Sequence, residues 1–165
     1  MKKKIIITGG LGYIGTELCK LYSGVSWNHK IIVIDNRFIS ERVNQLRNWN
    51  MEFIQGDILD KELIKIHFKD ADVVHHLAGV TDVPRTKSES NNSQDLKIKE
   101  VGEKGTQNIL DVINDKCKII FPSTHVVYEG INEIKTDISE NENTKPVLSY
   151  SSSKAVNEEQ LKKSG

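Results

Sequence analysis

The chain has 165 residues, 37% hydrophobic and 28% charged, and its 23 basic side chains balance 23 acidic ones to a formal net charge of zero. This length predicts one domain, residues 1–165, around a single core. The charge balance argues against a nucleic-acid partner, which requires a surplus of Lys and Arg. The longest apolar runs, such as residues 31–34, are far shorter than the roughly 20 residues that cross a bilayer, so we expect no membrane partner.

The two cysteines, Cys19 and Cys117, lie far apart, and neither belongs to a CxxC pattern or has His-rich sequence beside it. This spacing argues against a disulfide framework and against zinc, so we predict two free thiols and no metal site. Free thiols are typical of a reducing compartment, and we therefore expect the protein in the cytoplasm. The basic start MKKKIIITGG has too short an apolar stretch for a secretory signal, which predicts a mature N-terminus.

Short β-branched runs alternate with longer stretches of helical period, which predicts βαβ units and a parallel sheet. The predicted strands are Lys4–Thr8, Lys30–Asp35, Met51–Gln55, Val73–Leu77 and Lys118–Pro122. The predicted helices are Ile14–Tyr22, Glu41–Arg47, Lys61–Phe68, Asp95–Asn114 and Ser149–Lys163. Right-handed crossovers then give a doubly wound, Rossmann-type α/β fold with strand order 3-2-1-4-5 and helices on both faces. Segments 82–93 and 130–146 are predicted loops, because they are rich in Asn, Ser, Thr, Glu and Lys.

The first strand runs directly into the turn TGGLGYIG, whose glycines at 9, 12 and 15 open a helix. Such glycines permit a tight turn, let the backbone approach a pyrophosphate and let the helix pack near the strand, while the helix N-terminus offers free N–H groups. Asp35 ends the second strand, where a carboxylate accepts hydrogen bonds from ribose hydroxyls. An acid there repels a 2′-phosphate, which favours NAD over NADP, although Arg37 leaves NADP open.

Further motifs follow in order along the chain. They are Gly56-Asp57-Ile58, His76-Leu77-Ala78-Gly79, Gly105-Thr106-Gln107-Asn108, the run FPSTHVVY at 121–128, and Tyr150-Ser151-Ser152-Ser153-Lys154. With the glycine turn and the pair Asp35-Asn36, these motifs make the chain resemble the extended short-chain dehydrogenase/reductase family. Within that family it is most similar to the NAD-dependent nucleotide-sugar epimerases and dehydratases, whose patterns TGGxGYIG, HLAG, GTxN, FxSSxxVY and YxxxK match these segments. The resemblance covers essentially the whole chain.

The resemblance implies that NAD is the cofactor and assigns residues to it. Asp57 would contact the adenine, the segment after His76 would lie beneath the cofactor, and Lys154 would bond the ribose. The residues expected to bind NAD are Gly9, Gly12, Tyr13, Ile14, Gly15, Asp35, Asn36, Asp57, Ile58, Leu77, Ala78, Gly79, Tyr150 and Lys154.

Tyr150 and Lys154 lie four residues apart on a predicted helix and therefore share one face. An ammonium near the phenol favours phenolate and lowers a pKa that starts near about 10, so that the Tyr becomes a general base near neutral pH. The resemblance adds Thr124 as the hydroxyl that orients the substrate. It implies that Tyr150 removes a proton from a sugar hydroxyl as hydride passes from the carbinol carbon to NAD.

The sequence departs from the family pattern at several positions. Sugar dehydratases carry Asp-Glu after the Ser or Thr, whereas this chain has His125 and Val126, and Val126 transfers no proton. His125 is a second candidate for a general acid, because its pKa lies near neutrality. Glu129 replaces the usual Gly after VY and predicts an altered turn. Gly102 stands where Asn is common, which puts a hydrogen bond near the active site in doubt.

The family's chains continue into a substrate lobe that is absent here, so we expect this chain to be a fragment of a larger enzyme. The predicted function is that of a NAD-dependent nucleotide-sugar epimerase, which oxidises the sugar to a transient 4-keto intermediate and returns the hydride. The alternatives are a related sugar dehydratase, reductase or dehydrogenase, and a non-catalytic NAD-sensing module. The resemblance also implies a homodimer formed through the helices Asp95–Asn114 and Ser149–Lys163.

Overall fold

The structure is a computed structural model that describes residues 2–81, 83 and 86–164. Contacts divide the chain into two compact units. The sheet unit contains the chain up to Gly79 and the segment Gly105–Pro122, and the α6 unit contains Val80–Lys104 and the chain from Ser123 onward. The assignment of residues 1–165 to one domain stays a prediction.

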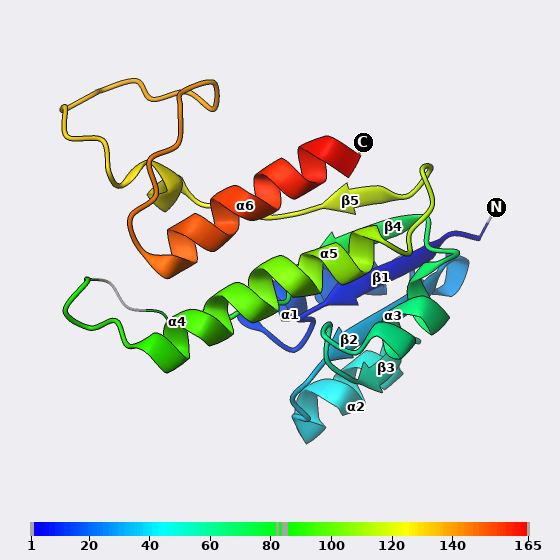
Figure 1. The fold of residues 1–165 in the computed structure, drawn as a ribbon. Coiled ribbons are helices and arrows are strands. Elements are labelled where there is room, and N and C mark those ends of the chain that lie inside the picture. Colours follow the sequence, from blue (N-terminus) through cyan, green and yellow to red (C-terminus); the bar gives the residue numbers. More distant parts are fainter. Residues whose placement is uncertain (1, 82, 84–85, 165) are drawn as a thin grey trace. The chain divides into compact units, whose positions relative to one another are not determined.

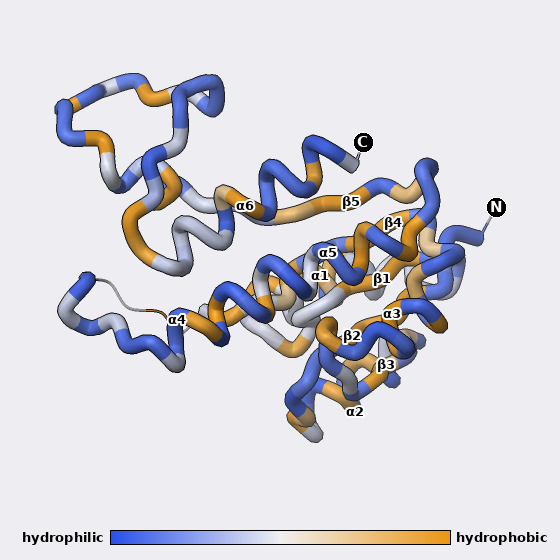
Figure 2. Tube along the Cα trace, in the orientation of Figure 1, coloured by the Kyte–Doolittle hydropathy of each residue, from blue (hydrophilic) through white to orange (hydrophobic). Residues whose placement is uncertain are grey.

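The sheet unit is built on five parallel strands that run side by side (Figure 1). They are β1 (Lys4–Thr8), β2 (Lys30–Asp35), β3 (Glu52–Gln55), β4 (Val73–His76) and β5 (Lys118–Ile120). The order β3-β2-β1-β4-β5 confirms the predicted doubly wound topology. In this order β1 is central, so its end at Thr8 lies between Ile34 of β2 and His76 of β4. The central strand β1, which contains three consecutive isoleucines, stands out as a hydrophobic segment in Figure 2.

Helices cover both faces of this sheet. On one face the strands pack against α1 (Tyr13–Ser23) and α2 (Ser40–Asn48). A short 3-10 turn, η1 (Ser26–Asn28), lies between α1 and β2 along the chain. The buried cluster there consists of Ile5, Ile7, Leu11, Cys19, Ile31, Val33, Val43, Leu46 and Met51. The alternate strand residues, which point the other way, are equally buried. The helices α3 (Lys61–Phe68) and α5 (Gly105–Leu110) pack together and bury Ile64, Phe68 and Ile109.

The predicted helix Asp95–Asn114 is wrong as a single element. The structure has α4 (Asn92–Lys99), a π-helical stretch η2 (Glu100–Lys104) and α5, which ends at Leu110. Gly102 and Gly105 fall at the break, and glycine is a poor former of the α-helix interior. Gly105 is held close to Ile58, whose side chain would lie 2.4 Å from an added Cβ.

Strand and helix ends differ from the predictions by one or two residues. Strand β3 begins at Glu52 because the α2 helix ends through Asn50, which has a φ of 56°, and Met51 donates its N–H back to Leu46. Strand β5 ends at Ile120, before Pro122, which has no N–H for a ladder. The predicted loop over 82–93 lies partly outside the described residues, and α4 already begins at Asn92.

The α6 unit contains α4, η2, a 3-10 turn η3 (His125–Tyr128) and the long helix α6 (Ser149–Ser164). The predicted helix over 149–163 and the predicted loop over 130–146 are confirmed. Two side-chain amides of α6 satisfy carbonyl groups of the π-helical stretch. Asn157 Nδ2 donates to Gly102 O at 3.1 Å, and Gln160 Nε2 donates to Glu103 O at 3.1 Å. These bonds hold α6 against η2 within the unit.

Candidate active site

The turn after β1 requires its glycines. Gly9 adopts a φ of +65°, and a Cβ there would lie 2.7 Å from the backbone nitrogen of Ala78. A Cβ on Gly15 would lie 2.5 Å from Gly9 O, and one on Gly10 would lie 2.1 Å from Val33 Cγ1. The turn is closed by Gly12 N–H, which donates to Gly9 O at 3.0 Å. The backbone is therefore drawn tightly around the start of α1, as a phosphate-binding turn requires.

The N-terminus of α1 presents its N–H groups without competition from an acid. Its N-cap is Gly12, no side chain among the described residues caps it, and its first turn contains no carboxylate. Tyr13 and Ile14 begin the helix and are 85% and 60% exposed. A helix N-terminus in this state favours an anion, through its N–H groups and the positive end of the helix dipole.

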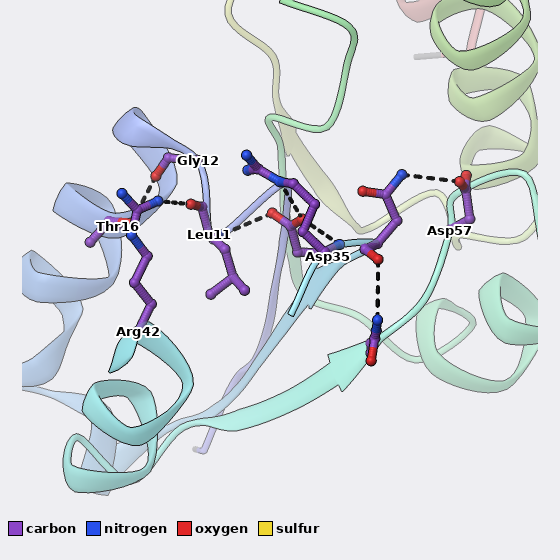
Figure 3. A network of polar contacts seen from close by, with 9 residues as sticks. Leu11, Gly12, Thr16, Asp35, Arg42 and Asp57 are labelled. Carbon is purple, nitrogen blue, oxygen red and sulfur yellow. Dashed lines mark hydrogen bonds and ion pairs between the residues drawn. The ribbon is translucent and has the colours of Figure 1, made fainter. Parts of the chain in front are cut away.

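Asp35 ends β2 and fixes the turn of β1 from the neighbouring strand (Figure 3). One carboxylate oxygen, Oδ2, accepts the Leu11 N–H at 3.0 Å, and the other, Oδ1, accepts the N–H and the Nε–H of Arg37 at 3.0 and 3.2 Å. Arg42 reaches the same turn, since its guanidinium donates to Leu11 O. The carboxylate thus orders the turn. Arg37, whose positive charge left NADP open as the cofactor, is paired with this carboxylate.

Asn36 and Asp57 lie together beyond the ends of β2 and β3. Asn36 Nδ2 donates to Asp57 Oδ2 at 3.2 Å, and Asp57 Oδ1 accepts the Leu59 N–H at 2.9 Å (Figure 3). Gln55 Nε2 donates to the carbonyl of Asn36 at 3.3 Å. Ile58, by contrast, is buried and packs beneath Gly105, so its side chain is part of the core.

A buried chain of hydrogen bonds supports the segment Leu77–Gly79. Thr8 Oγ1 accepts the Ala78 N–H at 3.0 Å and is also hydrogen-bonded to His76 Nδ1, 2.9 Å away. His76 Nε2 is hydrogen-bonded to Thr106 Oγ1, 3.0 Å away, so both ring nitrogens have partners. This chain of hydrogen bonds gives His76 a structural role inside the sheet unit. Sequence reasoning assigned no hydrogen bond to Thr8 or Thr106, because the two are linked through His76, which is distant from both along the chain.

The second group of predicted residues lies in the α6 unit. Tyr150 and Lys154 share a face of α6, and Lys154 Nζ lies 5.8 Å from the centroid of the Tyr150 ring. The ammonium thus lies over the ring face. Burial raises the pKa of the Tyr150 phenol above its ordinary value and lowers the pKa of Lys154 to about 8. The predicted lowering of the phenol pKa is therefore wrong, because burial dominates the environment of both groups.

Thr124 precedes η3 and caps it, with Oγ1 accepting the Val126 N–H at 3.4 Å. His125, the alternative acid, is exposed at the first position of η3. The structure thus groups the glycine turn, Asp35, Asp57 and Leu77–Gly79 in the sheet unit, and Thr124, Tyr150 and Lys154 in the α6 unit.

The described residues contain neither a membrane-spanning helix nor a cluster of metal-binding side chains. Across residues 2–81, 83 and 86–164, no helix has both the length and the apolar character needed to cross a membrane. Within those same ranges, no three side chains of His, Cys, Asp or Glu gather as a metal ion would require.

Comparison with known proteins identifies relatives along nearly the whole chain. The family described as the 3-beta hydroxysteroid dehydrogenase/isomerase family matches residues 6–165. The dTDP-D-glucose 4,6-dehydratase of Dictyostelium discoideum is 35% identical over 93% of this chain and 38% of its own length. A putative UDP-glucose 4-epimerase of Methanocaldococcus jannaschii is 35% identical over 96% of this chain and 50% of its own. The chain therefore spans half or less of the length of these relatives.

Solved structures give the same result. The UDP-glucuronic acid 4-epimerase of Bacillus cereus superposes with a TM-score of 0.79 at 28% identity, over 98% of this chain and 52% of its own. The UDP-N-acetylglucosamine 4-epimerase of Methanobrevibacter ruminantium superposes with a TM-score of 0.76 at 31% identity, over 99% of this chain and 51% of its own. Fold, turn geometry and relatives agree, and the chain belongs to the 3-beta hydroxysteroid dehydrogenase/isomerase family, among the NAD-dependent epimerases and dehydratases of the extended short-chain dehydrogenase/reductase type.

Proposed function

We propose that the intact protein is a NAD-dependent nucleotide-sugar epimerase. The observation that carries the proposal is the pairing of Tyr150 with Lys154 on α6 in a chain whose first βα turn is shaped by close-packed glycines. Relatives with epimerase names in both comparisons support the reaction class.

The geometry of the sheet unit fits NAD. The α1 N-terminus lacks a side-chain cap and a first-turn acid, which suits the pyrophosphate. Asp35 is the acceptor for ribose hydroxyls, Asp57 for the adenine, and Leu77–Gly79 would lie beneath the cofactor. The complete proposed set is Gly9, Gly12, Tyr13, Ile14, Gly15, Asp35, Asn36, Asp57, Ile58, Leu77, Ala78, Gly79, Tyr150 and Lys154. The buried side chain of Ile58 limits its contribution to its backbone.

The chemistry needs a proton acceptor, an orienting donor and a cation. Tyr150 accepts the proton of the sugar hydroxyl, Thr124 donates a hydrogen bond to that oxygen, and Lys154 bonds the cofactor ribose. NAD, when bound by these residues, would supply the reversible hydride acceptor for the carbinol carbon of the sugar. Burial raises the pKa of the Tyr150 phenol, so the positive charge of Lys154 has to offset that burial for the phenol to act as a base.

A sugar dehydratase is the second candidate. The similarity to the Dictyostelium dehydratase favours this function. Val126 argues against it, because its side chain has no titratable group at a position where sugar dehydratases carry an acid. We further propose a homodimer, and the cytoplasm as its compartment, since Cys19 and Cys117 are both free.

The test uses the full-length protein with NAD and a panel of UDP- and dTDP-sugars. An epimerase gives interconversion of C4 epimers by chromatography with no net NADH absorbance, a dehydratase gives a 4-keto product with loss of water, and a dehydrogenase accumulates NADH. Binding of NAD without turnover of any sugar would contradict the proposal and favour an NAD sensor.

A further inference from the structure

Glu129, the residue that follows η3, binds the segment that leads into α6. Its Oε1 accepts the N–H of Val147 and the N–H of Leu148, both at 2.8 Å, and it also accepts the hydroxyl of Ser151. Three donors from five consecutive residues therefore converge on one carboxylate oxygen from a residue 18 to 22 positions earlier in the chain.

This carboxylate anchors the residues that lead into the helix. The helix α6 begins at Ser149, so the N–H groups of Val147 and Leu148 belong to the two residues before it, and the Ser151 hydroxyl belongs to its first turn. The carboxylate of Glu129 thus ties the entry segment to the first turn, at the end where a negative charge interacts favourably with the helix dipole. Burial acts to raise the pKa of Glu129, but the hydrogen bonds from Ser151, Leu148 and Val147 outweigh it, so that the net pKa lies below its ordinary value.

Backbone bonds beside Glu129 strengthen the same connection. Gly130 N–H donates to Lys145 O, and Lys145 N–H donates to Val127 O, each at 2.8 Å. A Cβ on Gly130 would lie 2.5 Å from Lys145 O, so this close approach requires glycine. Glu129, which replaces the usual Gly after VY, and the following Gly130 thus connect the end of η3 to the segment that leads into α6.

The connection bears directly on the proposed active site. Tyr150 lies between Leu148 and Ser151, which both bind Glu129, and Thr124 caps the 3-10 turn that Glu129 follows. Glu129 therefore fixes the spacing between the general base and the orienting hydroxyl without reaching either reacting group.

We infer that Glu129 is a positioning residue that holds Tyr150 and Thr124 in register for proton transfer, an inference that rests on the proposed function. A side chain in this role affects the chemical step more than cofactor affinity, because most of the proposed NAD residues, from Gly9 to Gly79, belong to the sheet unit, whereas Glu129 belongs to the α6 unit.

The experiment compares the full-length protein with E129A, E129Q and the control E133A, which removes an exposed carboxylate from the same loop. We expect E129A to speed amide exchange at Val147 and Leu148 at least about tenfold, because an open helix end exchanges freely. We expect its kcat to fall about tenfold to a hundredfold, the scale of a small misplacement in an active site, and the Kd of NAD to change by a smaller factor. E129Q should recover part of the slow amide exchange and part of the kcat, since its amide oxygen accepts the same N–H groups without the charge. E133A should match the wild type in both measurements.

Wild-type exchange and kcat in E129A would overturn the inference. If thermal melting shows that E129A does not fold, E129Q becomes the test variant. A kcat and amide exchange rates equal to those of the wild type in E129Q would then overturn the inference. Loss of the proposed function is distinguishable, because a wild-type protein that converts no nucleotide sugar still yields the exchange rates and an NMR titration of the Tyr150 phenol. A phenol pKa that shifts in E129A and is restored in E129Q then supports the positioning role.

Discussion

At the scale of single residues, the phenol oxygen of Tyr150 is the atom on which the proposed chemistry depends. Tyr150→Phe removes that oxygen and keeps the ring, so we expect folding and NAD affinity to persist while turnover falls by about 10²–10⁴-fold, the usual worth of general-base catalysis. Thr124→Ala should cost less, because the proton acceptor remains. The alkaline-rising limb of the kcat profile should disappear in Tyr150→Phe. Near-normal turnover of Tyr150→Phe with an unchanged pH profile of kcat would show that another group accepts the proton. His125 would be the first residue to test.

Lys154 provides a prediction about stability. Burial lowers the pKa of its ammonium from 10.5 to about 8, so below pH 8 the folded protein carries a charge that the unfolded chain solvates better. Because the unfolded chain binds more protons between pH 8 and 10.5, stability rises with pH across that window. Lys154→Met should therefore stabilise the unliganded protein at pH 7 by on the order of 3 kcal/mol, and the gain should shrink towards zero above pH 10.5.

Urea unfolding at pH 7 and at pH 10.5 measures this effect, with Lys163→Met as the control at an exposed position of the same helix. A destabilised Lys154→Met protein at pH 7 would show that the contacts of the ammonium outweigh its desolvation.

At the scale of elements, the π-helical stretch η2 packs against α6 through Gly102. An added Cβ on Gly102 would lie 2.2 Å from Ser153 Oγ, and Ser153 is buried. We expect Gly102→Ala to destabilise the protein by about 1–3 kcal/mol, the usual cost of overpacking. The pair Gly102→Ala with Ser153→Ala should recover most of it, since the next contacts of the Cβ are 3.5 and 3.7 Å.

A double-mutant cycle from thermal melts measures this coupling. Gly24→Ala is the matched control, because no atom lies within 4 Å of the added Cβ there and its φ is −67°. Additive losses in the cycle would mean that Ser153 moves aside and does not limit the packing.

At the scale of the whole molecule, the cofactor preference follows from the charge at the end of β2. Asp35 is 6% exposed and keeps its carboxylate beside the glycine turn, where a 2′-phosphate would meet a negative charge. We expect calorimetry to show tighter binding of NAD than of NADP. Tighter binding of NADP would mean that Arg37 leaves Asp35 and pairs with the phosphate.

The proposed dimer is a prediction at the same scale. Leu96 on α4 and Val156 on α6 are 68% and 39% exposed, and both lie on elements expected in the subunit interface. Light scattering of the full-length protein should give twice the subunit mass across a wide concentration range. A stable monomer would contradict the proposed dimer. A Leu96→Glu variant that dimerises as well as the wild type would contradict an interface through α4.

The fold was predictable because its signals are local or periodic. Continuous β-branched runs such as residues 31–34 predict strands buried on both faces, and the chain order of strands and helices with right-handed crossovers predicts the sheet order. The break of the helix after Lys99 was not predicted, since glycines at 102 and 105 are tolerated in helices and the decision depends on Ser153 and Ile58, which are distant in sequence. The direction of the pKa shift at Tyr150 was wrong for the same reason, because burial is a property of packing that spacing does not contain.

By itself, the sequence determined the parallel sheet, the phosphate turn with its acid, and the residue types of the Thr-Tyr-Lys set. Each depends on chemistry within a few residues or on a repeated period. Only the tertiary structure decided that Asp35 orders the turn through Leu11, that Thr8, His76 and Thr106 form one buried chain, and that Glu129 binds the segment leading into α6. These contacts join residues 19 to 68 positions apart, and their energies depend on distances and burial that exist only when the chain is folded.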